Sequence, residues 1–415
     1  MSLSKFTLNF LRGSKVARAS GVFCARGLGS AQPELEKKPD FNVRWNKVVA
    51  DAEKIVGYRN SFIGLRWLLS EEVENIAVQI RKMKKSKHPL IKTVKDLIAN
   101  ANNSKQPWGL VILLISKALG HNAKISIAPA EESVGYLHSQ RALAEITEMI
   151  RTSHIVHKGL LNIPKDTPAE KLDNIVNGNK LALLCGDHLL STSCLELAKL
   201  ENQELVELMS SAVRDLSESG FIGVRDYQNL PLPSFPRNGG ATNFKLPEDP
   251  LDPVKPGDAL GVAKSEWTLR NILDGGNLLG KACQGSLILA GHSTTTQRQA
   301  YQFGLNLALA WQANTDLKSF APQYNNTVFS LVSAPVLFTL EQEPALYEEI
   351  EKGQQNVNDV NYEKIREMVI AGPGLEKTKN LLEELCNNTF EFLEKLPDSE
   401  AKEGLESLIT RIAGK

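Results

Sequence analysis

Apolar side chains recur along most of the chain at steps of three and four residues, which places them on one face of an α-helix. The clearest example is residues 139–161, where one face would carry Leu143, Ile146, Ile150, Ser153, Val156 and Leu160. The same spacing predicts further helices at 107–119, 180–200, 204–216, 268–291, 295–320, 362–370 and 375–396. Strand-like alternation is scarcely visible. The pattern therefore predicts an all-α fold, a single-domain bundle in which several helices are buried on most faces.

One stretch, residues 221–267, breaks this helical pattern. It contains seven prolines and the pair Gly239 and Gly240. Proline lacks a backbone N–H group and its ring clashes with the preceding helical turn, so regular helix is excluded there. The sequence predicts a loop or disordered insertion, mobile and on the surface, between two core helices. We expect one helical domain over residues 41–415 with this insertion inside it.

The composition fits a folded chain and excludes several classes of protein. Hydrophobic residues make up 42% of the 415, enough for a sizeable core. Lys and Arg number 48, as do Asp and Glu, so no net charge favours nucleic acid as a partner. The longest strongly apolar run, Trp108 to Ile115, is far shorter than the ~20 residues that a membrane-spanning helix needs, and we expect no transmembrane segment. The five cysteines form no CxxC pair, which predicts a reducing compartment without zinc or disulfide frameworks.

The N-terminal 33 residues have a composition of their own. They carry five Lys or Arg residues and several serines, and the first acidic residue is Glu34. This basic, acid-poor composition is typical of a mitochondrial transit peptide, and an apolar core of about 7–15 residues, which a secretory signal requires, is missing. We expect residues 1–40 to be a transit peptide and disordered leader of a mitochondrial protein. A merely disordered basic tail is the alternative.

Three stretches, in order, resemble the trans-polyprenyl diphosphate synthases. They are 148–157 (EMIRTSHIVH), 178–190 (GNKLALLCGDHLL), and Lys281-Ala282 followed by 301–304 (YQFG) and 309–312 (LAWQ). Residues 396–400 also match the end of that family, so the likeness runs from about Val43 to the C-terminus without the Pro-rich stretch. The resemblance implies an isoprenoid-synthase fold and a reaction in which isopentenyl diphosphate extends an allylic diphosphate. In this family two DDxxD motifs face each other across a cavity and hold Mg²⁺ on the diphosphate oxygens.

Both acidic motifs are degenerate in this chain. The first window, residues 158–162, reads KGLLN, so Lys158, Gly159 and Asn162 stand where the family has carboxylates. The second window, residues 315–319, reads TDLKS and keeps only Asp316. Mg²⁺ releases water reluctantly and relies on carboxylates and phosphates for binding. A single Asp, with the positive charges of Lys158 and Lys318 nearby, would repel the ion. We therefore expect no metal site, no bound cofactor and no catalytic residue in this chain.

Some of the other residues that bind diphosphate in the family are also missing from this chain. Residues 103–109 stand where the family carries GGKRxRP, and they lose both arginines with their bidentate phosphate contacts. The resemblance implies a degenerate pocket whose substrate-binding positions are Lys105, His157, Lys158, Lys281, Gln312 and Asp316.

Two positions leave alternatives open from the residues alone. His154 and His157 stand three residues apart and could hold a metal, but the absence of a carboxylate at a helpful offset favours ordinary helix histidines. Lys281 could grip a diphosphate or cap a helix near Gly280.

Within the family, the pattern resembles the non-catalytic subunit of heteromeric decaprenyl (solanesyl-type) diphosphate synthases. The resemblance implies a catalytic partner subunit that bears both DDxxD motifs and the Mg²⁺, in a heterodimer or heterotetramer of the mitochondrial matrix that makes the ubiquinone side chain. Helices 107–119 and 139–161 are the expected interface, because their apolar residues exceed what one solvent-facing surface explains.

Two other hypotheses remain. An autonomous enzyme could use the helical cavity without the metal cluster, although the loss of both acidic motifs opposes this. A helical prenyl-lipid-binding or scaffold protein would retain only the fold.

Overall fold

The computed structural model describes residues 41–58, 90, 106–125, 128–163, 165, 167–237, 242–324 and 327–414, so the expected leader, residues 1–40, lies outside the described part. The described residues form helices and no β-strand, apart from an isolated bridge between Arg225 and Pro231. The all-α fold is confirmed. In chain order the main helices are α2 (Phe41–Val56), α6 (Trp108–Leu119), α7 (Pro129–Val134), α8 (His138–Lys158), α9 (Ala169–Ala198), α10 (Gln203–Glu218), α11 (Ala263–Asn271), α12 (Asn277–Leu289), α13 (Thr294–Lys318), α14 (Ala334–Leu340), α15 (Ala345–Glu351), α16 (Tyr362–Ala371), α17 (Gly374–Leu393) and α18 (Glu400–Ile412).

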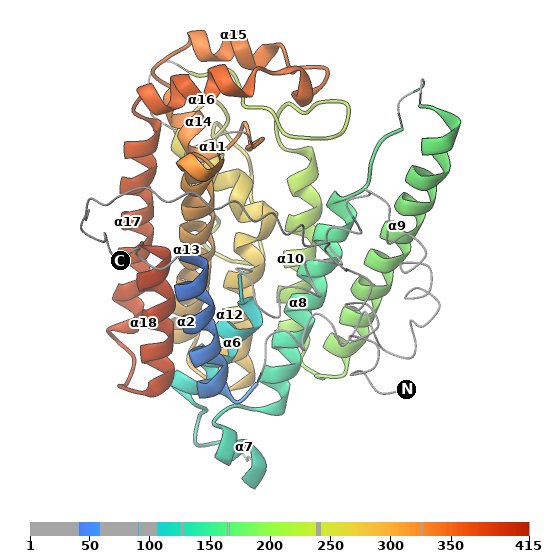
Figure 1. The fold of residues 1–415 in the computed structure, drawn as a ribbon. Helices are drawn as coiled ribbons and strands as arrows, with labels where there is room; N and C mark the ends of the chain where they lie inside the picture. Colours follow the sequence, from blue (N-terminus) through green and yellow to red (C-terminus); the bar gives the residue numbers. More distant parts are fainter. Residues whose placement is uncertain are drawn as a thin grey trace, which may run out of the picture.

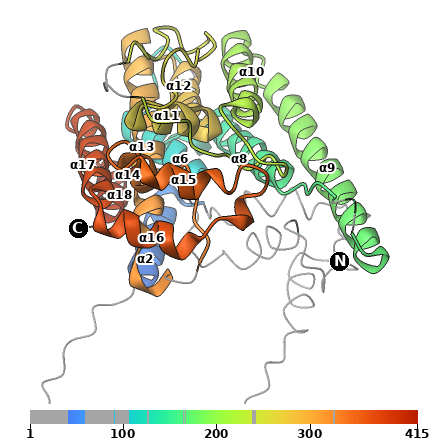
Figure 2. The ribbon, with the colours of Figure 1, turned by 90° about the horizontal axis from the view of Figure 1, so that it is seen from above.

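Helix α12 is the centre of the bundle, and its side chains from Asn277 to Ile288 are all buried. Helices α6, α8, α10 and α13 pack around it. Helices α17, α18 and α2 lie on one side of this group, and α9 forms the opposite edge beside α8 (Figures 1 and 2). The shorter α14, α15 and α16 gather at the end of the bundle where α13 terminates, around a second, smaller hydrophobic cluster.

Two glycines allow α12 and α13 to approach closely. A Cβ atom on Gly280 would lie 2.9 Å from the carbonyl oxygen of Tyr301, and one on Gly304 would lie 2.8 Å from that of Leu279. Real Cβ atoms do not approach carbonyl oxygens this closely, so larger residues would force the helices apart. The second window lies on α13, and this contact fixes that helix against the core.

The predicted helices are confirmed with small shifts at their ends, with two exceptions. Helix α9 begins at Ala169, well before the predicted start at residue 180, and 268–291 is two helices. A π-helical turn, Ile272–Gly276, separates α11 from α12. Gly275 has a φ of 154° there, and a Cβ atom at this position would lie 2.8 Å from the ring of Trp108. Apolar periodicity alone could not reveal this turn, because the residues on both sides of it are buried.

The Pro-rich stretch contributes more buried residues to the core than its sequence predicts. Residues 222–237 and 242–262 contain no helix, as expected, but α11 already begins at Ala263, inside the predicted loop. Leu232 and Val254 are buried, and Trp267 is fully buried. The expectation that this stretch lies on the surface is wrong at these residues, because isolated apolar residues can pack onto a core without forming a helix.

A buried ion pair holds both ends of this stretch to α11. Glu266 is 2.7 Å from Arg270, and it also accepts hydrogen bonds from the backbone N–H groups of Ser234 and Gly261. Arg270 donates to the carbonyl oxygens of Ile222 and Leu232. The Pro-rich stretch is therefore anchored by polar contacts at several points along its length.

The apolar surplus of the expected interface helices has another explanation. Ten of the twelve residues of α6 are buried within this chain, and the apolar side chains of α8 largely face the same core. Five exposed apolar residues lie instead on α9, namely Leu172, Val176, Leu183, Leu184 and Leu195, and five more lie in the Pro-rich stretch, namely Phe221, Val224, Tyr227, Leu230 and Phe235. Core burial within this chain accounts for most of the apolar pattern of α6 and α8, and an interface on these helices stays a prediction.

Helix α9 also meets a membrane criterion that the search for continuous apolar runs missed. Its stretch Lys171–Ala198 is, among the described residues, the one helix long and apolar enough to cross a membrane, and 33% of the tested window is buried. The core helix of a soluble protein can pass the same test. The absence of a transmembrane segment therefore stays a prediction.

Candidate functional site

The first window begins at the C-terminal end of α8 and faces a carboxylate that the sequence analysis did not single out. The ammonium group of Lys158 lies 2.7 and 2.8 Å from the two carboxylate oxygens of Asp274, and His154 Nε2 lies 2.9 Å from the first of them. Burial raises the pKa of Asp274, but the charge of Lys158 and the contact with His154 outweigh it and lower this pKa to about 2. Asp274 is thus an ionised member of an internal cluster.

The π-helical turn explains how Asp274 reaches α8. The turn offsets residues 272–276 from the regular helix that follows, and the close approach of Trp108 to Gly275 excludes a side chain there. The sequence Asp274-Gly275-Gly276 inside a helical pattern could have indicated this turn, because paired glycines within a predicted helix often mark an irregular backbone.

His157 contacts α9 and does not share a ligand with His154. Its Nε2 atom lies 3.3 Å from Asp187 Oδ1 and 3.3 Å from the carbonyl oxygen of Leu183. A Cβ atom on Gly186 would lie 2.1 Å from the same nitrogen, so only glycine leaves room for the ring. The two histidines meet different carboxylates on different elements, which favours their reading as packing residues over a shared metal site.

The end of the first window is covered by the Pro-rich stretch. The backbone N–H of Asn162 donates to Gln228 Oε1 at 2.7 Å, and the Gln228 amide donates back to the carbonyl oxygen of Asn162 at 2.9 Å. The side-chain amide of Asn162 also donates to the carbonyl oxygen of Tyr227. Asp226, which precedes Tyr227, accepts a hydrogen bond from the backbone N–H of Val357 at 3.0 Å. The segment thus links the first window to the small helices at the end of the bundle.

The second window holds its carboxylate in the interior. Asp316 is 4% exposed and accepts hydrogen bonds from Trp267 Nε1 at 2.8 Å, from the backbone N–H of Ala334 at 2.9 Å and from Gln312 Nε2 at 2.8 Å. Burial raises the pKa of Asp316 to about 6, although these three hydrogen bonds act in the opposite direction. Burial also lowers the pKa of Lys318 to about 8, and the charge of Arg411 contributes. Asp316 and Gln312 therefore serve the packing of α11, α13 and α14 against one another.

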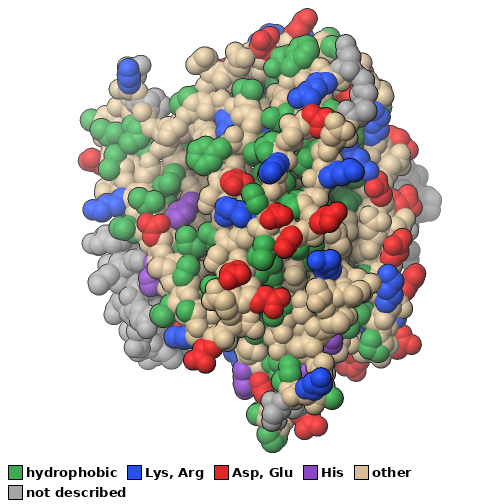
Figure 3. All heavy atoms as spheres, turned by 180° about the vertical axis from the view of Figure 1, so that it is seen from behind, with side chains coloured by type: hydrophobic (Ala, Val, Ile, Leu, Met, Phe, Trp, Pro, Cys, Tyr) green, Lys and Arg blue, Asp and Glu red, His purple; other side chains and the backbone are tan. Residues whose placement is uncertain are grey.

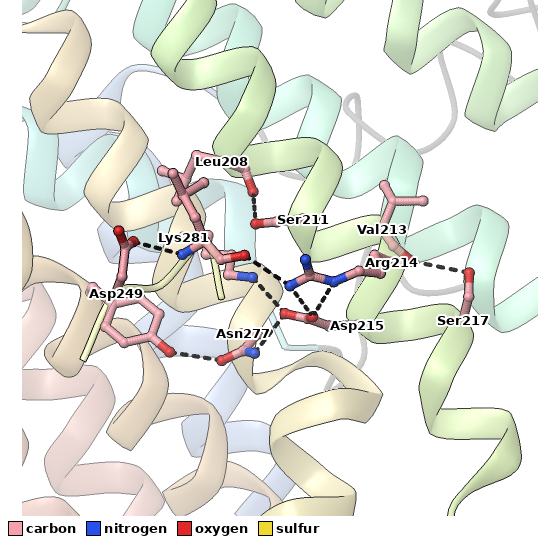
Figure 4. A network of polar contacts seen from close by, with 11 residues as sticks. Leu208, Ser211, Val213, Arg214, Asp215, Ser217, Asp249, Asn277 and Lys281 are labelled. Carbon is pink, nitrogen blue, oxygen red and sulfur yellow. Dashed lines mark hydrogen bonds and ion pairs between the residues drawn. The ribbon is translucent and has the colours of Figure 1, made fainter. Parts of the chain in front are cut away.

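Lys281 is not placed to contact a diphosphate. It is 0% exposed, and its ammonium group contacts Asp215 of α10, which also accepts a hydrogen bond from Asn277 at 2.7 Å (Figure 4). Arg214 lies 3.1 Å from the other oxygen of Asp215, and Tyr301 donates to Asn277. Burial lowers the pKa of Lys281, whereas Asp215 raises it. Both readings of Lys281, as a diphosphate ligand and as a helix cap, are wrong, because α12 is buried on all sides and this residue faces α10.

The donor atoms of the described windows do not fit Mg²⁺. This ion requires oxygen ligands in near-octahedral geometry, usually carboxylates together with phosphates and water. Asp274 is neutralised by Lys158, and Asp316 is enclosed by hydrogen-bond donors. Among the described residues, no group of three or more His, Cys, Asp or Glu side chains could hold a metal ion. Lys105, the remaining expected pocket residue, lies outside the described residues.

Comparisons with known proteins identify the family. No protein-family model matches the chain. The chain is 37% identical over 373 residues to the Mus musculus All trans-polyprenyl-diphosphate synthase PDSS2, covering 88% of this chain and 86% of that protein. The Homo sapiens protein of the same name is 36% identical over 394 residues, with 92% and 90% covered. Hexaprenyl pyrophosphate synthase, mitochondrial, of Saccharomyces cerevisiae is 29% identical over 301 residues, with 67% and 63% covered.

Solved structures agree on the fold. The apo form of Arabidopsis medium/long-chain length prenyl pyrophosphate synthase superimposes with a TM-score of 0.52 at 20% identity, covering 84% of this chain and 98% of that one. The high identity to the mammalian proteins over most of both chains, together with this shared helical fold, carries the assignment. The chain belongs to the all-trans-polyprenyl-diphosphate synthase family.

Proposed function

We propose that this chain is a non-catalytic, regulatory subunit of a heteromeric all-trans-polyprenyl (decaprenyl-type) diphosphate synthase that makes the ubiquinone side chain. A partner subunit with intact DDxxD motifs would bind Mg²⁺ and join isopentenyl diphosphate to the allylic diphosphate. The observation that carries this proposal is the state of the two windows, where Lys158 pairs with Asp274 and Asp316 is buried. Departure of diphosphate depends mainly on electrostatic stabilisation of the leaving charge, and neither window offers a free carboxylate for a metal.

The surface of α9 supports a partner subunit. Its exposed apolar side chains lie on a helix that, among the described residues, packs mainly on α8, and hydrophobic side chains gather on the upper part of this edge, at the left of Figure 3. Burial of apolar surface contributes about 25 cal/mol per Å², so such an edge favours association. We place the catalytic subunit there, in a heterodimer or heterotetramer.

The names of several relatives support a mitochondrial location. Four of them, from two yeasts, a filamentous fungus and rice, are named as mitochondrial hexaprenyl or solanesyl synthases. The basic, acid-poor residues 1–33 agree with import. We propose the mitochondrial matrix as the compartment.

The central experiment compares the chain alone with the chain co-expressed with a DDxxD-bearing synthase subunit. The isolated chain should show no Mg²⁺-dependent condensation of allylic and isopentenyl diphosphates, and the co-purified complex should be active. Replacing the aspartates of the partner's motifs should abolish the activity of the complex. Robust turnover by the isolated chain would overturn the proposal. A folded chain that never binds such a subunit at micromolar concentrations, and binds a prenyl lipid instead, would favour the scaffold hypothesis.

A matched pair of surface variants locates the interface. Leu184→Glu on α9 should weaken co-purification with the catalytic subunit at least tenfold, because it introduces a charge into the apolar edge. Ile370→Glu on α16 is the control, since Ile370 is exposed to a similar extent, 51% against 48%. Equal losses in both variants would remove α9 as the docking face.

A further inference from the structure

Two side chains of α8 contact one carboxylate at the first window. Lys158 contacts both oxygens of Asp274, and His154 contacts one of them. Arg225, from the Pro-rich stretch, interacts electrostatically with this carboxylate, but it donates its hydrogen bonds to Asn229 and to the carbonyl oxygens of Ser219 and Ile222. Burial and the charge of Arg270 lower the pKa of Arg225, and the charge of Asp274 raises it. A lysine ammonium group beside a second nitrogen-bearing side chain is a common arrangement for binding a phosphate group.

The anion at the centre of this cluster is part of the chain itself. The π-helical turn places the carboxylate of Asp274 against α8, and its side chain is still 37% exposed. A small anion in solution could therefore reach Lys158 and His154. The internal carboxylate has the advantage, because it needs no loss of translational and rotational freedom to occupy them.

We propose that the first window is a latent anion site of the diphosphate-binding type, which the chain fills with its own carboxylate, Asp274. The internal ion pair excludes free diphosphate groups from Lys158 and His154. If the chain is the non-catalytic subunit proposed above, this plug keeps it from sequestering the diphosphate substrates of its partner. That consequence rests on the proposed function, whereas the site itself can be tested on the chain alone.

The test measures binding of inorganic pyrophosphate to the purified chain in the presence of EDTA, so that no metal contributes. Isothermal titration calorimetry should show no saturable binding to the wild-type protein at millimolar pyrophosphate. Asp274→Asn removes the internal charge with little change of shape and should bind pyrophosphate at least tenfold more tightly. The double variant Lys158→Gln/Asp274→Asn should lose this gain.

A matched control separates the site from a general gain of positive charge. Lys264 and Glu384 form an ion pair of the same length, 2.7 Å, on the surface away from the windows. Glu384→Gln frees a lysine there and should not create pyrophosphate binding. Equal gains in Glu384→Gln and Asp274→Asn, or wild-type affinity equal to that of Asp274→Asn, would overturn the proposal.

If Asp274→Asn does not fold, a labelling experiment on the wild-type protein tests whether Asp274 blocks the site. The rate at which an amine-reactive reagent labels Lys158 should be unchanged by pyrophosphate, because the anion cannot displace Asp274. Protection of Lys158 by submillimolar pyrophosphate would overturn the proposal. Neither result bears on partner binding, so a failure here is distinguishable from a failure of the proposed function.

Discussion

The two windows hold carboxylates in opposite environments. Asp274, at the first window, is 37% exposed, is paired with a lysine, and has a pKa lowered to about 2. Asp316, in the second window, is 4% exposed, lies among neutral hydrogen-bond donors, and has a pKa raised to about 6 by burial. The first carboxylate is held by charge near solvent, where ion pairs contribute little, and the second by hydrogen bonds in the interior, where an unmade bond is costly. The two carboxylates are therefore held by different physical means in one chain.

The largest difference should appear when each carboxylate is deleted. Asp316→Ala leaves Trp267 Nε1 and the backbone N–H of Ala334 without their acceptor, and we expect a loss of about 3 kcal/mol in the free energy of unfolding. Urea denaturation measures this loss. Asp316→Asn, which keeps an acceptor oxygen, should lose clearly less. A loss below about 1 kcal/mol for Asp316→Ala would show that water or a side-chain movement replaces the carboxylate.

The free energy of unfolding should change with pH in opposite directions for the carboxylates of the two windows. The pKa of Asp316 is raised from 3.8 to about 6, so its stabilising contribution is present below about pH 4 and is lost as the pH rises through 6. At about 1.4 kcal/mol per pKa unit, this change is on the order of 3 kcal/mol. Asp316→Asn has no titrating group at this position, so the variant should gain stability relative to wild type between pH 4.5 and 7.5. A constant difference between the two proteins over this range would contradict the raised pKa.

Asp274 should show the opposite trend on a smaller scale. Its pKa is lowered from 3.8 to about 2, so its contribution is present above about pH 4 and is lost as the pH falls toward 2. The side chain is more than a third exposed, and solvent screening reduces the effect to about 1 kcal/mol or less. A double-mutant cycle of Lys158→Gln and Asp274→Asn should give a coupling of about 0.5–1 kcal/mol. This coupling should shrink in 1 M NaCl, whereas the effect of Asp316→Ala should not. A coupling that salt leaves unchanged would place the pair in a drier environment than its exposure indicates.

The smallest effect concerns the cover over the first window. Gln228→Ala removes two hydrogen bonds to the backbone of Asn162, and we expect a loss of about 0.5–1 kcal/mol because both residues are open to solvent that can replace them. Hydrogen exchange at the Asn162 amide should become faster while the amides of α12 stay unchanged. Slow exchange at Asn162 in the variant would mean that other contacts close this end of the window.

The sequence by itself determined the fold class and the residue types that replace the DDxxD motifs in the two windows. Steps of three and four residues report which side chains share a helix face, so the positions of most helices followed directly from the pattern. The residue types in 158–162 and 315–319 are visible without any structure. Prolines in 222–262 excluded helix by local chemistry alone.

Only the tertiary structure decided which groups meet. Lys158 and Asp274 are 116 residues apart in the chain, and Asp316 and Trp267 are 49 apart, so no local spacing links them. Lys281 lies on a helix that is buried on every side, and apolar periodicity cannot tell which neighbour such a residue faces. The exposed apolar edge of α9 is likewise a result of packing, because a helix pattern shows that an apolar face exists but not whether the same chain covers it.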